Sequence, residues 1–226
     1  MSDKKRILIV YATAGIGHKK AAMAVFEELK HRNSDVDAKI VDVLHYSSFI
    51  FRKTYAQIYV FLIRRFSFLW GFFYHSLNIR LVHSILAPAR RAIHVLNSRG
   101  FARLLLEYRP HVVISTHFVA PDVCNYVKKK SGLKMQVINV ITDFRAHSFW
   151  ISPGVDIYAV GHERVKEELV AKWKIPATRV RVTGIPIEGK FLRGDSAGAI
   201  RKKMNISPDV FVTLLLSGGY GVGPML

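Results

Sequence analysis

One segment near the N-terminus constrains the fold more than any other: residues 6–29, RILIVYATAGIGHKKAAMAVFEEL. Residues 7–10 form a short apolar and mostly β-branched run, which is typical of a buried parallel strand. Beyond it, apolar residues recur at the spacing of one helix face: Ala22, Val25, Phe26 and Leu29. The turn between them holds Gly15 and Gly17, where backbone amides and a helix N-terminus favour an anion or a developing negative charge. The segment therefore predicts a βα unit with a ligand-binding turn.

The glycine turn fits neither of the two common nucleotide-binding motifs. A dinucleotide fingerprint needs a third glycine where this chain has Lys20, although Asp42 could serve as its acidic ribose residue. A P-loop needs lysine and then serine or threonine after the glycine, whereas here His18 and Lys19 follow Gly17. A helix N-terminus disfavours an imidazolium, so His18 should stay neutral and able to accept a proton. The alternative is that His18 only caps the helix or packs at the turn.

Strand and helix patterns alternate along the chain. Strands are predicted over residues 6–11, 38–43, 111–116, 135–141, 155–160, 179–183 and 210–216, with helical patterns that include 19–31, 90–107 and 162–173. Such alternation predicts an α/β fold with a parallel sheet and helices on both faces. Ligands bind beyond the carboxyl ends of such strands. Polar or glycine residues follow four of these strand ends: 15–18, 115–117, 142–147 and 184–187.

The alternation predicts an uneven division of the chain. Residues 1–190 should form one complete Rossmann-like α/β domain, and residues 191–226 a linker with the first strand and glycine loop of a second. A lone strand and loop cannot bury their apolar faces. We therefore expect the chain to be a fragment that holds only the beginning of the second α/β domain.

The formal net charge of +18 indicates an anionic partner or surface. Residues 45–109 carry ten Lys and Arg against the single acid Glu107. The chain has one cysteine, Cys124, so no internal disulfide can form and a reducing compartment fits. The N-terminal residues reach a strand too quickly for a secretory signal.

Twelve aromatic residues between positions 46 and 74 lie within this basic region. Many follow a helical stripe between residues 51 and 73, but Arg64 and Arg65 interrupt it, which excludes a membrane span of about 20 apolar residues. A basic, aromatic-rich amphipathic segment is typical of a helix that lies on an anionic membrane. The alternatives are a core helix with a solvated basic face and a nucleic-acid-binding surface. No RNA-binding signature accompanies the aromatics, so we expect no nucleic acid.

Several segments together resemble a known family. They are GIGHKKAA, STHFVAPD, VITDFRAHSFW, VTGIPI and SGGYGVG, and their order is that of bacterial processive diacylglycerol glycosyltransferases and plant-type monogalactosyldiacylglycerol synthases. The resemblance implies a two-domain GT-B fold and inverting transfer from a sugar nucleotide. It also implies an N-terminal domain that takes the lipid acceptor at the membrane and a C-terminal domain that binds the UDP-sugar donor. Two departures are that Ile16 adds bulk to a loop reading Gly-Gly-Gly-His in the family, and that most of the donor domain is absent.

The resemblance also implies roles for residues. His18 becomes a candidate general base for the acceptor hydroxyl. Asp143 could take that role instead or orient a histidine, and it would share a face with His147 if the chain turned helical after Thr142. The alternative for Asp143 is a helix N-cap. The other predicted site residues are Gly15, Gly17, His117, His147 and Trp150 at the cleft, Gly218, Gly219 and Gly221 at the donor diphosphate, and Arg64, Arg65, Trp70, Phe72 and Phe73 at the membrane. Packing is the alternative for His117 and for Trp150.

We expect neither a metal nor a cofactor besides the UDP-sugar co-substrate. The only Asp-x-Asp sequence, residues 35–37, lies in a polar turn before a predicted strand. The sequence thus predicts a peripheral glycosyltransferase at the cytoplasmic face of a membrane, which acts on diacylglycerol or a related lipid. The alternatives are a polyprenyl-linked acceptor and a non-catalytic basic module that binds membranes or nucleic acid.

Overall fold

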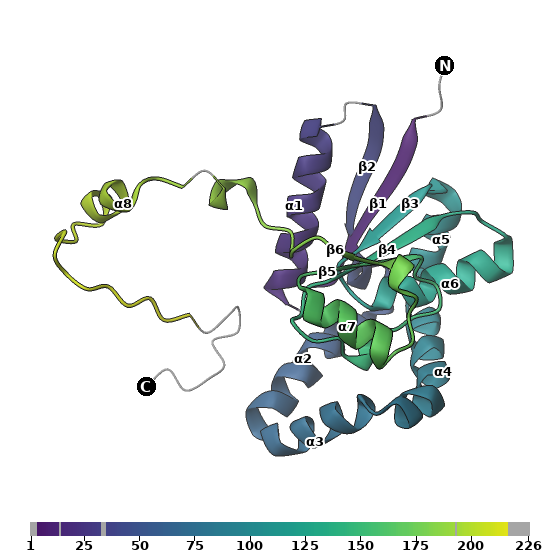
Figure 1. Cartoon of the computed structure of the whole chain (residues 1–226). Coiled ribbons are helices and arrows are strands. Elements are labelled where there is room, and N and C mark those ends of the chain that lie inside the picture. Colours follow the sequence, from purple (N-terminus) through teal and green to yellow (C-terminus); the bar gives the residue numbers. More distant parts are fainter. Residues whose placement is uncertain (1–3, 14, 33–34, 193, 217–226) are drawn as a thin grey trace.

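Six parallel strands form the sheet of this protein, in the order β2-β1-β3-β4-β5-β6 (Figure 1). The structure is a computed structural model that describes residues 4–13, 15–32, 35–192 and 194–216. The strands are β1 (Lys5–Tyr11), β2 (Val36–Asp42), β3 (Val112–Ser115), β4 (Gln136–Ile141), β5 (Ile157–Val160) and β6 (Val180–Val182). Each of these lies within two residues of its predicted ends, so the predicted α/β fold with a parallel sheet is confirmed.

Helices cover both faces of the sheet (Figure 1). They are α1 (Ile16–Arg32), α2 (Phe49–Arg65), α3 (Ser67–Leu77), α4 (Arg80–Asn97), α5 (Arg99–Tyr108), α6 (Val119–Ser131), α7 (Glu163–Ala171) and α8 (Ala197–Lys203). Short 3₁₀ turns are η1 (Val43–Tyr46), η2 (Ser148–Trp150), η3 (Ala177–Arg179) and η4 (Gly189–Phe191). Alternate residues of β1 serve the two faces: Ile9 packs with Ala22 of α1, and Leu8 with Phe101 of α5.

Two helical segments are broken where the sequence predicted continuity. The helix predicted over residues 90–107 is divided between α4 and α5 at Ser98, which is fully buried and lies within 3.0 Å of the Ser47 hydroxyl. The aromatic stripe over residues 51–73 is likewise divided between α2 and α3 at Phe66, whose backbone is not helical. Both breaks let the helices turn around the end of the sheet, which helical periodicity alone does not encode.

The strand predicted over residues 210–216 does not form. Its side chains are exposed, with Phe211 90% accessible, and no described strand lies beside it. A strand needs hydrogen-bonding neighbours and a layer to cover its apolar face, and neither is present among the described residues. After β6 the chain leaves the sheet, and α8 stands apart from it (Figure 1). Within the described residues, none of the helices is both long and apolar enough to span a bilayer.

Candidate active site

The carboxyl ends of β1, β3 and β4 border a pocket of about 860 Å³, which α2, α3 and α4 close from the other side. Its lining residues are Gly15, Ile16, Gly17, His18, Phe51, Thr54, Tyr55, Ile58, Leu62, Trp70, Gly71, Tyr74, Arg90, His94, His117, Phe118, Asp143, His147, Phe149 and Trp150. The structure thus brings together the two catalytic candidates and all five predicted cleft residues. They converge because parallel strands end at the same edge of the sheet.

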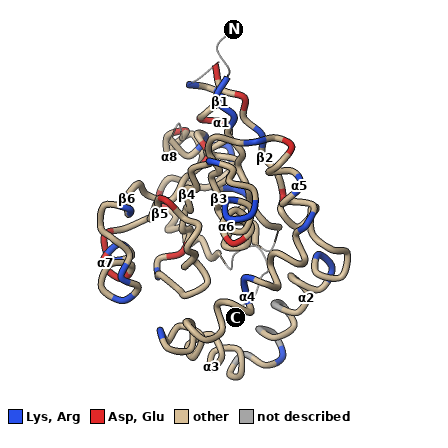
Figure 2. Tube along the Cα trace, turned by 90° about the vertical axis from the view of Figure 1, so that its right-hand side faces the viewer, with Lys and Arg blue, Asp and Glu red and all other residues tan. Residues whose placement is uncertain are grey.

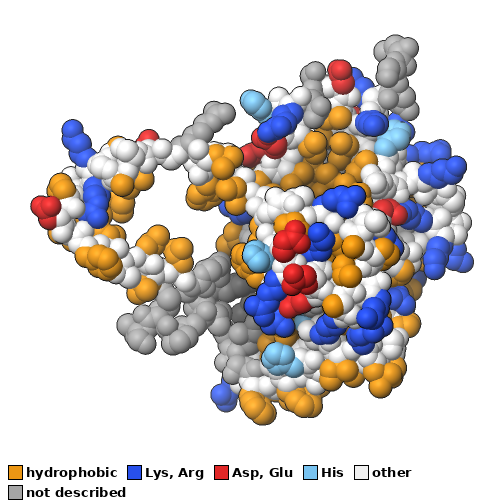
Figure 3. Space-filling view, in the orientation of Figure 1, with side chains coloured by type: hydrophobic (Ala, Val, Ile, Leu, Met, Phe, Trp, Pro, Cys, Tyr) orange, Lys and Arg blue, Asp and Glu red, His pale blue; other side chains and the backbone are white. Residues whose placement is uncertain are grey.

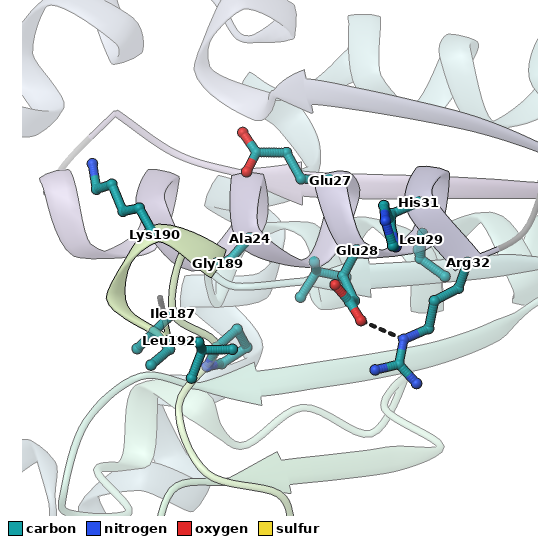
Figure 4. A pocket seen from close by; sticks show the side chains of 12 residues that line it. Ala24, Glu27, Glu28, Leu29, His31, Arg32, Ile187, Gly189, Lys190 and Leu192 are labelled. Carbon is teal, nitrogen blue, oxygen red and sulfur yellow. Dashed lines mark hydrogen bonds and ion pairs between the residues drawn. The ribbon is translucent and has the colours of Figure 1, made fainter. Parts of the chain in front are cut away.

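The fourth predicted strand end does not reach this pocket. Pro186 and Ile187 instead line a separate hollow of about 1110 Å³ against Ala24 and Leu29 of α1 (Figure 4). Glu188, next in the chain, forms an ion pair with Lys20 of α1. The segment after β6 therefore belongs to the side of α1 and not to the polar cluster.

His18 lies in the first turn of α1, and Thr142 fixes its ring. The Nδ1 atom is 3.0 Å from the Thr142 hydroxyl, and the His18 carbonyl accepts a hydrogen bond of 2.8 Å from the Thr116 hydroxyl. Burial lowers the pKa of His18 below its ordinary value, opposed by the nearby charge of Asp143. The imidazole is therefore neutral near pH 7, as predicted, with burial as the largest cause.

Asp143 is held by an indole and does not lie on a helix. Its Oδ2 accepts a hydrogen bond of 2.8 Å from Nε1 of Trp150. The chain bends without helical structure between Thr142 and His147, so the predicted shared helix face was wrong. The N-cap alternative was wrong too, because His147 caps η2, the next helical turn. The partner that fixes the ring of His18 is Thr142, which sequence reasoning did not single out.

Both ring nitrogens of His147 bind backbone groups. Its Nδ1 accepts from the Phe149 amide at 3.2 Å, so Nε2 carries the proton and donates to the Tyr74 carbonyl at 2.9 Å. The ring also stacks on Tyr74 with centroids 3.9 Å apart, and burial lowers its pKa. His147 therefore joins η2 to α3 and forms part of the pocket wall.

His117 is both packed and turned toward the site. It is only 1% exposed, stacks on Phe118, and lies with its ring centroid 5.0 Å from that of His18. Its Nδ1 accepts from the Val119 amide at 3.3 Å, which leaves the proton on Nε2. Burial keeps the pKa of His117 well below its ordinary value. The ring is thus a neutral hydrogen-bond donor beside His18.

Asp42 is used by its own chain. Its carboxylate accepts from the Thr13 hydroxyl and from the Leu44 amide at 2.9 Å. These bonds tie the end of β1 to the turn after β2, beside the glycine turn. The acid of the dinucleotide alternative is therefore occupied, and that alternative loses its remaining support.

The predicted membrane residues divide between the surface and the pocket. Phe72 is 61% exposed, and Phe73 and Arg65 are exposed as well, whereas Trp70 is half-buried and lines the pocket. The side chain of Arg64 lies outside the described residues. Other large apolar side chains exposed on α2, α3 and α4 are Phe49, Ile50, Ile58, Phe61, Phe68, Leu69, Leu81, Ile85, Leu86, Ile93 and Leu96.

Charge accompanies this apolar surface. The tube over α2, α3 and α4 carries Lys and Arg but no Asp or Glu (Figure 2). The space-filling view shows apolar side chains along its lower edge, where Figure 1 places these helices (Figure 3). The three helices therefore present a basic and apolar face, while Phe51 and Tyr55 of α2 pack against the core, as the core-helix alternative predicted for part of the segment.

The predicted donor-loop residues are not part of this pocket as described. Gly218, Gly219 and Gly221 lie outside the described residues. Within the described part of the chain, no group of three or more His, Cys, Asp or Glu side chains could hold a metal ion. Sequence reasoning missed Arg90, which lines the pocket, and Asp122, the buried carboxylate that pairs with it. The only signal for Asp122 was its place in STHFVAPD, and Arg90 was counted as surface charge.

Comparison with known proteins identifies the family. The sequence model of monogalactosyldiacylglycerol (MGDG) synthase matches residues 18–187. The chain belongs to the MGDG synthase family. It is 27% identical to processive diacylglycerol beta-glucosyltransferase of Bacillus subtilis (strain 168) over 238 residues, which cover 98% of this chain and 56% of the relative. It is 29% identical to monogalactosyldiacylglycerol synthase 2, chloroplastic, of Arabidopsis thaliana, which covers 98% and 47% respectively.

The chain thus spans about half the length of the curated relatives it matches. Among solved structures, the apo form of the lipopolysaccharide outer core galactosyltransferase WaaB aligns with a TM-score of 0.46 and 20% identity. That alignment covers 82% of this chain and 47% of the other. The match to the family model includes His18 at its first residue and extends to Ile187.

Proposed function

We propose that this protein is the acceptor-binding half of a glycosyltransferase that moves a sugar from a UDP-sugar to diacylglycerol or a related lipid. The observation that carries the proposal is the pocket, where a neutral histidine faces an apolar wall that continues to an exposed basic and apolar surface. The family and the names of its relatives support the same activity.

The two ends of the pocket match the two ends of such an acceptor. Diacylglycerol carries one free hydroxyl, beside two ester groups, on two long apolar chains. Phe51, Ile58, Leu62 and Trp70 of α2 and α3 provide apolar walls, and His18 stands at the polar end. A volume of about 860 Å³ suits the glycerol and the upper parts of the acyl chains, while the rest of each chain stays in the membrane.

The chemistry is a single displacement. The acceptor hydroxyl oxygen attacks the anomeric carbon, the bond to the UDP oxygen breaks, and the hydroxyl proton passes to Nε2 of His18. This base is available in the tautomer in which Nδ1 donates to Thr142. One displacement inverts the anomeric centre. The departing diphosphate leaves on the face opposite His18, where the predicted glycine loop of residues 218–221 in the donor half would stabilise it through backbone amides without a metal.

The donor site completes the enzyme from outside the described residues. Because the relatives are about twice as long, we assign UDP-sugar binding to a second GT-B domain that the glycine loop of residues 218–221 would begin. The exposed face of α2, α3 and α4 holds the protein at the cytoplasmic surface of an anionic membrane. The complete enzyme is therefore this chain joined to its donor half.

The test is transfer by the complete enzyme in vesicles that contain diacylglycerol, with several labelled UDP-sugars and with EDTA present. We expect a glycosyldiacylglycerol with inverted anomeric configuration, and no transfer or appreciable UDP-sugar affinity from residues 1–226 alone. Transfer to a polyprenyl-linked acceptor but not to diacylglycerol would contradict the proposed acceptor and favour the polyprenyl alternative. Loss of activity in EDTA would contradict the metal-free mechanism, and micromolar UDP-sugar binding by residues 1–226 would contradict the division of the site.

A further inference from the structure

Arg90 of α4 crosses to the opposite wall of the pocket and binds three backbone carbonyls. Its Nη1 donates to Ser148 at 3.1 Å and to Phe149 at 3.2 Å, and its Nη2 donates to Ile151 at 2.9 Å. All three carbonyls belong to η2 or to the residue that follows it. A guanidinium is the side chain whose rigid fork of donors can satisfy several neighbouring oxygens at once.

A buried carboxylate holds Arg90 in this position. Asp122 has a fully buried side chain, and its Oδ2 lies 3.6 Å from Nε of Arg90 and 2.8 Å from Nδ1 of His94. Arg90 and His94 are one turn apart on α4, so the same oxygen forms an ion pair with Arg90 and lies within hydrogen-bond distance of His94, whereas Nε of Arg90 has no hydrogen-bond partner among the described residues. A buried carboxylate is costly unless it is paired, which makes the arrangement hard to rearrange.

The turn that Arg90 holds leads directly to Asp143. Trp150 is the last residue of η2, and its indole donates to Oδ2 of Asp143. Trp150 is 2% exposed, so its ring has little freedom to move independently of its backbone. A shift of η2 would therefore move the indole and, with it, the carboxylate beside His18.

We propose that Arg90 is a positioning residue, which sets the Asp143 carboxylate relative to His18 through η2 and the indole of Trp150. The inference rests on the proposed function for the catalytic role of His18. Direct binding of substrate by Arg90 is the competing explanation, because Arg90 also lines the pocket. The Nη donors of Arg90 already serve backbone carbonyls, which favours positioning.

The first test needs no activity. In a ¹⁵N-labelled chain, the indole signals of Trp70, Trp150 and Trp173 can be resolved, and Trp150→Phe assigns the relevant one. We expect Arg90→Lys to move the Trp150 indole signal more than the other two, because one ammonium cannot replace three contacts. The matched control is Arg103→Lys, at an exposed position of α5. An unmoved Trp150 signal in folded Arg90→Lys overturns the proposal.

The second test is kinetic and uses the complete enzyme. A misplacement of a catalytic group by about 1 Å can cost up to about a hundredfold in rate, so kcat of Arg90→Lys should fall about tenfold to a hundredfold with little change in acceptor KM. The kcat of Trp150→Phe should fall by a similar factor. The kcat of the double variant should fall no further than that of the more impaired single variant. Additive losses, or a change in KM alone, would overturn positioning in favour of direct binding.

The pH profile separates positioning from a general loss of stability. Around His18 stand Asp143 after β4 and His117 after β3, and only Asp143 is negatively charged. Its charge raises the pKa of His18, so moving it away should shift the acid limb of kcat/KM to lower pH. Should Arg90→Lys not fold, Trp150→Phe must still show this shift, and a wild-type profile there overturns the proposal. Wild-type turnover by His18→Ala would instead defeat the proposed function, while the indole test still decides the position of Asp143.

Discussion

The two walls of the pocket differ in how far their side chains are buried. The strand-end wall consists of the residues that follow β1, β3 and β4, and the helical wall consists of α2, α3 and α4. At the strand ends, the aromatic rings of His117 and Trp150 are almost fully buried, and hydrogen bonds fix their polar atoms. On the helical wall, α3 leaves Phe68 89% exposed and Phe72 61% exposed. Burying one such side chain stabilises a protein by about 1.5–3 kcal/mol, so this wall forgoes considerable stabilisation.

The difference indicates that one wall serves the reaction and the other serves membrane contact. Fixed polar groups are what a displacement reaction needs, because geometry must be set before the reactants meet. An uncovered basic and apolar surface is what membrane contact needs, because lipid then supplies the missing burial. Substitutions in one wall should therefore leave the function of the other wall unchanged.

The largest expected effect belongs to the strand-end wall. His18→Ala in the complete enzyme should lower kcat by about 10²–10⁴-fold, because a general base is lost. Its binding to vesicles should not change, since His18 does not lie on the exposed helical surface. The measurements are steady-state transfer and vesicle sedimentation, with His45→Ala at an exposed position as control. Near-normal turnover by His18→Ala would remove the catalytic role of this wall.

The next effect belongs to the helical wall. Each basic residue near an anionic surface contributes about 1 kcal/mol, so Arg64→Glu with Arg65→Glu should weaken vesicle binding by well over tenfold. Replacing Phe72 and Phe73 by Ser should release the protein as well. The control pair Lys129→Glu and Lys130→Glu makes the same charge change on α6, which lies away from α2 and α3 (Figure 1).

Vesicles with rising anionic lipid and rising salt complete this comparison. Binding should increase with the anionic fraction and decrease with salt. Equal binding to neutral and anionic vesicles would contradict the electrostatic part. If the control variant Lys129→Glu with Lys130→Glu were also released from vesicles, the net charge of the protein, and not the helical wall, would determine membrane binding. Tight, salt-sensitive DNA binding without lipid binding would favour the nucleic-acid alternative.

A smaller effect concerns how stability depends on pH. It is not confined to the strand ends, because burial also lowers the pKa of His83 on α4, to about 4. Burial lowers the pKa values of His18, His117 and His147, so the unfolded chain binds protons more readily than the folded one. Stability should therefore be full above the unfolded histidine pKa of about 6.5 and fall as pH decreases below it. Denaturant unfolding between pH 8 and 5 measures this slope. His117→Gln should flatten the slope, whereas His45→Gln should not, and an unchanged slope in His117→Gln would contradict the assignment.

The smallest effect concerns the segment that joins neither wall. Residues 211–216 are exposed and lie beside no other described strand, so their amides should exchange with solvent almost without protection. The amides of β4, between two neighbours in the sheet, provide the internal reference. Hydrogen exchange followed by mass spectrometry measures both. Slow exchange over residues 211–216 would contradict this prediction, because it would mean that these amides are hydrogen-bonded to another segment.

The sequence alone predicted the strand-end wall well. A buried strand followed by a glycine turn and an amphipathic helix has few other solutions, and parallel strands must end at one edge. The strand pattern by itself therefore places His18, His117 and Asp143 together at that edge. Their individual contacts do not follow from the pattern, because Thr142 and Trp150 meet them only after the strands are paired.

Only the tertiary structure decided the helical wall and its links to the site. Trp70 lines the pocket while Phe72, two residues later, is exposed, because α3 packs against α2, α4 and His147 with one face only. Arg90 and Asp122 are 32 positions apart, and a pairwise contact of this kind leaves no periodic trace in the sequence. Residues 210–216 have the composition of a β-strand, but no strand among the described residues lies beside them. Local pattern fixes what an element can become, and the surrounding fold determines whether it does.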